Sequence, residues 1–325
     1  MKSFALRAAS TAGAFAAAGV TAKVLKDRES ERRRLTRGDE VPFGSVRGDA
    51  LEVISSDGLS IHTELDEGTG PTIVFVHGWL CDSDTWHYQR LAMRENNARM
   101  VVMDQRSHGR SGRSTHRNSG LDLLADDLAR VIETVAPEGP LVLVGHSMGG
   151  MTIMKLAQQR PDLFAERVKG VVLIGTSAGK LMRSSAMIRY VSGILRFGQP
   201  VLDWGRGFNS RSVIRRWGVG PDASDLALEL ANEMILRVPS SVISNFHANF
   251  LDLDLTAGLA TIASARTSVV CGTRDSITPF QHSKWIASNI EGSELVPVNG
   301  AGHMVMFEEP EQVTEAIERV LKDIE

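Results

Sequence analysis

The sequence predicts an α/β fold in which a mostly parallel sheet is flanked by helices and carries an inserted helical cap. Short runs of apolar, often β-branched residues recur along the chain, as in strands that are covered on both faces. Stretches with helical spacing separate these runs, and strands that alternate with helices in this way form parallel sheets. From Ser177 to about Asn249 the strand signal disappears and helical patterns follow one another. We interpret this stretch as an insertion over the carboxyl edge of the sheet.

The chain is expected to divide into three parts. Its 325 residues, 42% of them hydrophobic, suffice for one large domain with an insertion. We expect an N-terminal Ala-rich segment and charged linker over residues 1–40, and a helical cap over residues 177–250. The α/β core then consists of residues 41–176 and 251–325.

The elements of the core follow from local patterns. Two antiparallel strands, residues 51–55 and 60–65, are expected to form a hairpin around the turn Asp57-Gly58. The predicted buried strands are 72–77, 99–104, 141–144, 170–175, 267–271 and 294–298. The predicted helices of the core are 122–134, 148–159, 281–289 and 310–324.

The N-terminal segment differs in charge from the rest of the chain. The formal net charge is −3, yet residues 1–37 alone carry +6. This basic excess lies outside the predicted fold and has no interleaved aromatic residues, so no nucleic-acid partner is expected. Residues 8–22 form a run of small and apolar residues between basic ones. The run is short for a membrane-spanning helix, and the residues that follow it are unusually basic for a signal peptide. We expect membrane or cell-envelope association through residues 1–28; the alternative is a frayed cytoplasmic helix.

No cofactor or metal site is expected. The two cysteines, Cys81 and Cys271, lie far apart in the sequence and suggest neither a disulfide framework nor a metal site. Four histidines have no metal-ligand spacing with carboxylates and are interpreted as loop or packing residues. They are His87, His108, His116 and His146.

The most informative stretch is Gly145-His146-Ser147-Met148-Gly149, which joins strand 141–144 to helix 148–159. Glycines two positions before and after the serine permit a sharp turn, because a side chain there would collide with the neighbouring strand and helix. Such a turn exposes the Ser147 hydroxyl. It also leaves the Met148 N–H at the start of a helix, where it can stabilise an oxyanion.

A serine hydroxyl is a weak nucleophile and needs a base and an acid to activate it. Asp275 and His303 each follow a predicted strand, in loops that emerge at the same edge of a parallel sheet as Ser147. These residues are therefore predicted to form a catalytic triad. The alternative is that Asp275 caps the helix that follows and His303 is a buried structural histidine.

The rest of the predicted site comes from another strand end and from the cap. His77-Gly78-Trp79 ends strand 72–77, so the Trp79 N–H is expected to be the second oxyanion donor, while His77 organises the loop. A helical cap would supply apolar walls for a pocket. The residues expected to line it are Trp79, Met148, Met182, Met187, Trp217 and Met304.

From about Leu51 onward, the order of five motifs resembles the α/β-hydrolase fold superfamily. The motifs are His77-Gly78, residues 104–111, residues 145–149, residues 272–279 and Gly302-His303. The second is similar to that family's Asp-x-Arg-Gly-x-Gly-x-Ser loop, with Ser107 where glycine is usual, which implies that Asp104 shapes the site rather than reacts. Relatives that open epoxides or remove halide have aspartate where this chain has Ser147. The resemblance therefore implies acyl transfer.

The expected function is a serine hydrolase, esterase- or lipase-like, that cleaves carboxylic esters with an apolar acyl or alcohol part through an acyl-enzyme. The expected partner is a small, hydrophobic ester. Alternatives that the resemblance leaves open are a cofactor-free perhydrolase or haloperoxidase, a hydrolase of carbon–carbon bonds, thioesters or lactones, and a non-enzymatic ligand sensor of the same fold. Acyl chain length, leaving group and oligomeric state stay open, because a fold does not set specificity.

Overall fold

The computed structural model describes residues 41–115, 119–195 and 210–324. A compact unit that begins at Val46 contains its helices and strands. The N-terminal segment predicted to associate with a membrane, residues 1–40, lies outside the described residues, and so does His116. Within the described ranges, no helix is long and apolar enough to cross a bilayer.

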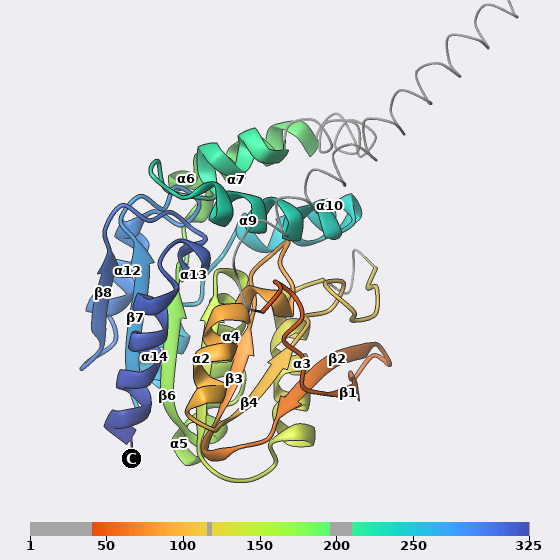
Figure 1. Ribbon diagram of the computed structural model, residues 1–325, viewed down its shortest axis with the longest axis vertical. Coiled ribbons are helices and arrows are strands. Elements are labelled where there is room, and N and C mark those ends of the chain that lie inside the picture. Colours follow the sequence, from red (N-terminus) through yellow and green to blue (C-terminus); the bar gives the residue numbers. More distant parts are fainter. Residues whose placement is uncertain (1–40, 116–118, 196–209, 325) are drawn as a thin grey trace, which may run out of the picture. The chain divides into compact units, whose positions relative to one another are not determined.

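The strands of the described chain form one eight-stranded sheet in the order β1-β2-β4-β3-β5-β6-β7-β8 (Figure 1). β1 pairs with β2, and β2 with β4, in antiparallel orientation, whereas all other neighbours are parallel. The predicted hairpin and mostly parallel sheet are confirmed. The strands are β1 Asp49–Ile54, β2 Ser60–Asp66, β3 Thr69–Val76, β4 Ala98–Met103, β5 Leu141–His146, β6 Val168–Ile174, β7 Arg266–Gly272 and β8 Glu294–Val298.

The central strands are the continuous apolar runs of the sequence. β5 is buried at every residue, as expected for a strand with helices on both faces. Its register pairs Gly145 with Val76 of β3, and His146 with Ile174 of β6. Because these strands run in the same direction, their carboxyl ends meet at one edge of the sheet, and β7 ends at the same edge with Gly272.

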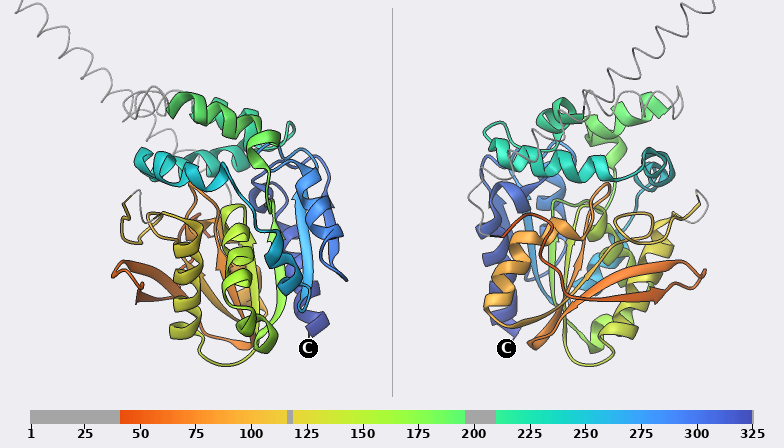
Figure 2. Two further views of the ribbon diagram at one scale, coloured as in Figure 1. Left: turned by 180° about the vertical axis from the view of Figure 1, so that it is seen from behind. Right: turned by 45° about the vertical axis from the view of Figure 1, so that its right-hand side comes forward.

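Helices cover both faces of this sheet. α2 (His87–Glu95) and α14 (Pro310–Ile324) lie on one face (Figure 1), and α3 (Leu121–Val135), α4 (Met148–Gln159) and α11 (Thr256–Ile262) lie on the other (Figure 2, left). α12 (Phe280–Ser288) packs on β7 and β8. The predicted core helices are all present. The sequence pattern did not indicate α2, α11, α5 (Pro161–Glu166) or α13 (Val305–Glu308), and the last three have four to seven residues, too few to show a helical period.

The segment predicted to be a cap consists of helices and loops in its described parts. α6 (Leu181–Ser184), α7 (Ala186–Leu195), α9 (Asp225–Arg237) and α10 (Ser240–His247) lie across the edge where the parallel strands end (Figures 1 and 2). A short 3₁₀ helix, η3 (Ala248–Phe250), follows α10. Residues 196–209 of this segment lie outside the described residues. We refer to residues 177–250 as the cap.

The cap and the sheet share one apolar cluster. Ile188, Val242 and Phe246 of the cap helices are buried in the same cluster as Val74 and Val76 of β3. Burial of apolar surface is the main favourable contribution to folding, so this shared cluster holds the cap against the strand ends.

Candidate active site

Ser147 lies at the junction between β5 and α4 in a strained backbone conformation. Its φ of 50° and ψ of −114° fall in a region that residues other than glycine rarely adopt. Two neighbours hold it there: the Ser147 N–H donates to the Ile174 carbonyl at 2.9 Å, and the Thr176 hydroxyl donates to the Ser147 carbonyl at 2.7 Å. The serine is therefore fixed at the strand-to-helix turn that the sequence predicts.

The glycines around Ser147 are required by close packing. A Cβ at Gly145 would lie 2.6 Å from Ile153 Cδ1, and a Cβ at Gly149 would overlap the Val76 carbonyl oxygen. The predicted collision with the neighbouring strand and helix is confirmed. Gly150, which the sequence argument did not use, is equally constrained, because a Cβ there would lie 2.8 Å from the Thr176 side chain.

Asp275 and His303 form a buried pair. His303 Nδ1 lies 2.8 Å from Asp275 Oδ2, and both side chains are almost fully buried. A carboxylate at this distance accepts a hydrogen bond from Nδ1–H, which leaves Nε2 as the basic nitrogen. Asp275 Oδ1 also accepts the backbone N–H groups of Ile277 at 2.8 Å and Thr278 at 2.9 Å. Asp275 therefore organises its own loop and orients the His303 ring.

The pair lies at the edge of the sheet where Ser147 lies. Gly175 directly follows Ile174, whose carbonyl accepts the Ser147 N–H. Gly175 is also close to the buried pair, because a Cβ there would be 3.3 Å from Asp275 Oδ2 and 3.5 Å from His303 Nδ1. Within the described chain, the Ser147 hydroxyl and His303 do not form a direct hydrogen bond. Such bonds between nucleophile and base are often long without substrate and tighten when it binds.

His146, directly before the serine, supports the His303 loop. Its Nε2 lies 3.1 Å from the His303 carbonyl oxygen, and the two imidazole rings are 4.7 Å apart between centroids. Burial, and then the proximity of His303, lower the pKa of His146 well below 6.5. His146 is therefore neutral at pH 7 and donates its Nε2–H to the His303 loop.

The loop after β3 lies directly beside Ser147. A Cβ at Gly78 would be 3.2 Å from Ser147 Cβ and 2.7 Å from His146 Nδ1. Neither the Trp79 N–H nor the Met148 N–H donates to an acceptor among the described residues. The Met148 N–H is at the start of α4, where the helix dipole favours negative charge. These two N–H groups are thus available for an oxyanion.

His77 and Asp104 organise the two loops beside the serine, as predicted. His77 Nδ1 lies 2.7 Å from the Gly78 carbonyl oxygen, and His77 Nε2 accepts the Gln105 N–H at 2.9 Å. Asp104 accepts the Ser83 N–H at 2.7 Å and the Arg110 N–H at 2.9 Å. Both side chains are therefore used in backbone contacts and have structural roles.

The residues predicted to line a pocket differ in exposure. The side chains of Met148 and Met304 are buried, while those of Trp79, Met187 and Trp217 are only partly buried. Trp217 lies close to the Asp275 loop, because its carbonyl accepts the Ser276 hydroxyl at 3.2 Å. The position of the Met182 side chain lies outside what the structure describes.

The two cysteines are buried free thiols. Burial raises the pKa of the Cys81 thiol to about 12, and it also raises the pKa of Cys271. Because the thiolate is the reactive form, neither cysteine is a nucleophile at neutral pH.

Two supporting residues were missed by the sequence argument. The Thr278 hydroxyl lies 2.8 Å from Asp275 Oδ2 and 2.7 Å from the Gly175 carbonyl. The Glu308 carboxylate accepts the Gly220 N–H at 2.7 Å and the Gly302 N–H at 3.0 Å, and burial raises its pKa. The only sequence signals were positions: Thr278 comes three residues after Asp275, and Glu308 comes five residues after His303. Such a position is a weak signal on its own.

Comparison with known proteins identifies the family. A family model described as "Alpha/beta hydrolase family" matches residues 73–316, about three quarters of the chain. The chain belongs to the alpha/beta hydrolase family. The predicted resemblance is confirmed, and this alpha/beta hydrolase shares its fold with solved esterases.

Three similar proteins indicate the range of chemistry around this hydrolase. A non-heme haloperoxidase of Rhodococcus erythropolis is 37% identical over 123 residues, which cover 38% of this chain and 43% of that protein. A pimeloyl-(acyl-carrier protein) methyl ester esterase of Nitrosomonas europaea is 28% identical over 266 residues, 78% of this chain and 96% of that protein. A thermophilic esterase from Thermogutta terrifontis, solved with malate bound, is 26% identical in sequence and has a TM-score of 0.69. The match covers 85% of this chain and 98% of the esterase chain.

Proposed function

We propose that this hydrolase cleaves carboxylic esters with an apolar acyl or alcohol part, with Ser147 as nucleophile. The observation that carries the proposal is the strained Ser147 at the start of α4, on the sheet edge that also holds the His303–Asp275 pair at 2.8 Å. The esterases among the similar proteins support the same reaction.

The proposed reaction begins when Ser147 Oγ attacks the ester carbonyl carbon and His303 Nε2 takes the serine proton. Asp275 stabilises the imidazolium that forms. The N–H groups of Trp79 and Met148 bind the negative oxygen of the tetrahedral intermediate. The alcohol leaves with the proton from His303, and the acyl group stays on Ser147.

The second half of the reaction repeats these steps with water. His303 Nε2 takes a proton from a water molecule, which attacks the acyl carbon, and the carboxylic acid leaves as Ser147 recovers its proton. The proposed preference for apolar esters rests on the cap, whose buried Phe246 and Phe250 lie in the apolar cluster beside the partly buried Trp79. Apolar walls with few polar groups are typical of small-molecule pockets.

The test is hydrolysis of p-nitrophenyl esters from acetate to decanoate by the wild type and by Ser147→Ala. We expect the wild type to turn over esters repeatedly and the variant to lose about 10⁶-fold in kcat, the loss typical for a serine nucleophile. Circular dichroism and Tm provide the folding control. Hydrolysis that persists in a folded Ser147→Ala variant would contradict the assignment.

A second candidate function is perhydrolysis, and the similarity to the R. erythropolis haloperoxidase favours it. In this reaction hydrogen peroxide rather than water attacks the acyl-enzyme, so that a peracid and free Ser147 are formed. The peracid then oxidises bromide outside the protein. Bromination of monochlorodimedone that requires both peroxide and a short carboxylic acid, and that is lost in Ser147→Ala, would establish it. Bromination at the rate of the uncatalysed mixture would exclude it.

For residues 1–28 we propose association with a membrane or cell envelope, because apolar and small residues there lie between basic ones. The experiment is fractionation of cells that express either the full chain or a version beginning at Asp39. The full chain should sediment with membranes and the shorter one should not. Equal distribution of the two would contradict the proposal.

A further inference from the structure

The loop between β3 and α2 carries the Trp79 N–H and is anchored to the core near its middle. Asp104 accepts the Ser83 N–H of this loop at 2.7 Å, and the loop ends in a short 3₁₀ helix, η1 (Ser83–Trp86). Between Trp79 and this helix lies Leu80, whose φ of 61° is unusual for a residue with a side chain. Only two residues separate Trp79 from Asp82, so a shift of Asp82 displaces Trp79.

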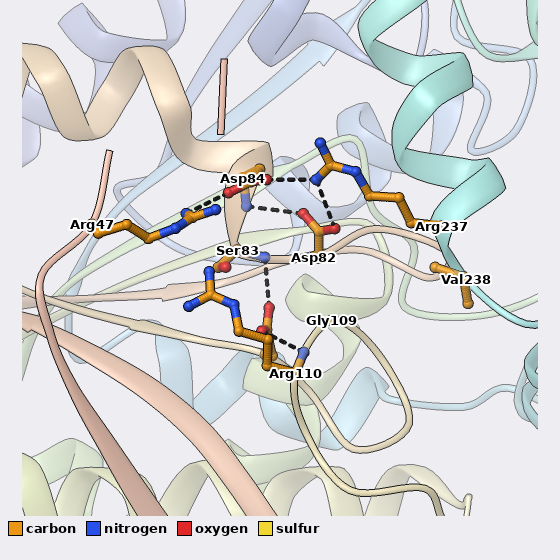
Figure 3. Close-up of a pocket in the computed structure, with 9 residues that line it drawn as sticks. Arg47, Asp82, Ser83, Asp84, Gly109, Arg110, Arg237 and Val238 are labelled. Carbon is orange, nitrogen blue, oxygen red and sulfur yellow. Dashed lines mark hydrogen bonds and ion pairs between the residues drawn. The ribbon is translucent and has the colours of Figure 1, made fainter. Parts of the chain in front are cut away.

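An arginine of the cap binds this loop. Arg237, at the end of α9, places its Nη1 2.5 Å from Asp84 Oδ2 and 3.2 Å from Asp82 Oδ2 (Figure 3). Arg47 approaches Asp84 from the other side, with Nη1 2.6 Å from Oδ1. These side chains line a pocket of about 220 Å³ where the cap meets the core.

The aspartates are buried and Arg237 is partly buried. The side chains of Asp82 and Asp84 are 8% and 5% exposed, and that of Arg237 is 33% exposed. Ion pairs on the open surface contribute little, but removing one partner of a buried pair leaves an uncompensated charge that the surroundings must accommodate. Loss of Arg237 would leave the two neighbouring carboxylates with Arg47, which pairs with Asp84 at 2.6 Å and lies 3.8 Å from Glu64.

Three further contacts join the same loop to the cap. The Trp79 indole Nε1–H donates to the Val242 carbonyl in α10 at 3.3 Å, and the Thr85 hydroxyl lies 3.3 Å from Met234 Sδ in α9. The Trp79 ring also packs against Phe250, 5.0 Å between centroids. The cap thus contacts this loop on both sides of Asp82 as well as through Arg237.

We propose that Arg237 is a positioning residue for the oxyanion hole: by binding Asp82 and Asp84 it lets the cap fix the place of the Trp79 N–H. The inference rests on the proposed ester hydrolysis. The cap then has two roles, because it encloses the substrate and also orders one of the two groups that stabilise the transition state.

The consequence is a loss in kcat rather than in substrate binding. An oxyanion donor acts on charge that exists only in the transition state, so its displacement lowers kcat and leaves KM nearly unchanged. Complete removal of one donor costs about 10²–10³-fold. For Arg237→Gln, which shifts the donor without removing it, we expect kcat for p-nitrophenyl butyrate to fall about tenfold or more.

A transition-state analogue distinguishes this role from general support of the cap. An alkyl boronic acid forms a tetrahedral adduct with the serine, and in Arg237→Gln its inhibition constant should rise by the same factor as kcat/KM falls. Arg237→Lys keeps a charge next to Asp84 and should recover part of the lost rate. Asp84→Asn should lower kcat as well, and the double variant should lose less than the product of the two single effects, since both act through one contact.

The matched control is Glu233→Gln. Glu233 Oε1 contacts Arg237 Nη2 at 2.6 Å on the same helix, so this variant removes the negative charge beside the arginine and leaves both aspartates in place. Its kcat should stay within about twofold of wild type.

The inference would be overturned if Arg237→Gln kept the kcat and the boronate affinity of the wild type. It would also be overturned if only the KM or the Tm of Arg237→Gln changed. If Arg237→Gln does not fold, the kcat of Arg237→Lys and of Asp84→Asn decides. Failure of the proposed function has a different outcome, because the wild type itself would then hydrolyse no ester.

Discussion

The carboxyl edge of the sheet and the cap that lies across it differ in how tightly their residues are held in place. At the sheet edge, Ser147 is held by backbone contacts to Ile174 and Thr176, and neighbouring glycines leave no room for a Cβ. In the cap, α7 buries only Ile188 fully among its described side chains, and its other residues are partly or fully exposed.

This difference separates chemistry from specificity. The geometry of the sheet edge follows from backbone pairing and steric exclusion, which allow almost no variation. The partly exposed side chains of α7 in the cap are less constrained by packing, so they can change with less effect on the fold. We therefore expect substitutions at the edge to affect every substrate alike, and substitutions in the cap to change the ratio of rates between substrates.

Among the variants that test this difference, the largest effect is expected for Asp275→Asn. The amide oxygen can still accept the N–H groups of Ile277 and Thr278, and its NH₂ group then faces His303 Nδ1, which must become an acceptor. His303 Nε2 would carry the proton and could not act as a base. By analogy with other triads we expect kcat to fall about 10⁴-fold for all esters. A loss confined to some esters, with others unaffected, would contradict the assignment of Asp275.

Gly149→Ala tests steric exclusion at the edge. A Cβ there overlaps the Val76 carbonyl oxygen, so β3 and α4 would have to separate. The free energy of unfolding should fall by about 1–3 kcal/mol or more, the usual cost of overpacking. Urea unfolding measures the change. Gly139→Ala is the opposite case. Gly139 has open space around it but a φ of 80°, so backbone strain and not a collision would lower the stability of this variant. A Gly149→Ala variant as stable as wild type would contradict the collision.

Trp217→Ala and Met187→Ala test the cap. If these partly buried residues line the pocket, the ratio of kcat/KM between butyrate and octanoate esters should change by about tenfold, as expected for a few methylene contacts. Ile54→Ala in β1, where the side chain is 58% exposed, is the control and should leave the ratio unchanged. A uniform loss for both esters would mean that these residues support the reaction centre instead.

The smallest effect concerns the pH dependence of the joint between cap and core. Burial, and then the charge of Asp84, raise the pKa of Asp82 from 3.8 to about 6. The folded protein binds this proton more tightly than the unfolded chain does, so Asp82 contributes stability below about pH 3.8 that is lost as the pH rises through 6. Asp82→Asn does not titrate. The Tm of the wild type relative to this variant should therefore fall between pH 4 and pH 7, by about 2–4 °C for each kcal/mol of this contribution that is lost. A constant difference would contradict the raised pKa.

The sequence indicated the sheet edge well because its signals are local. The glycines around Ser147, the apolar strands and the loop positions of Asp275 and His303 each reflect a backbone requirement that one short segment reveals. The short helices α5, α11 and α13 were not indicated, since four to seven residues cannot show a helical period.

Long-range contacts had no comparable signal. Arg237 meets Asp82 and Asp84 across more than 150 positions of sequence, and Glu308 meets Gly220 across 88. Charged residues are common in surface loops and helices, so nothing in their sequence neighbourhood distinguishes these pairs from solvated ones. Only the folded chain shows that the cap binds the loop that carries Trp79.

The central claim is that Ser147 is the nucleophile of this hydrolase, and covalent labelling tests it most directly. The wild type is treated with an alkyl fluorophosphonate, and the modified peptide is identified by mass spectrometry. We predict one label per chain, on Ser147, with much slower labelling in Asp275→Asn because the base is disabled. A label on another residue, or no label on a folded protein, would contradict the account.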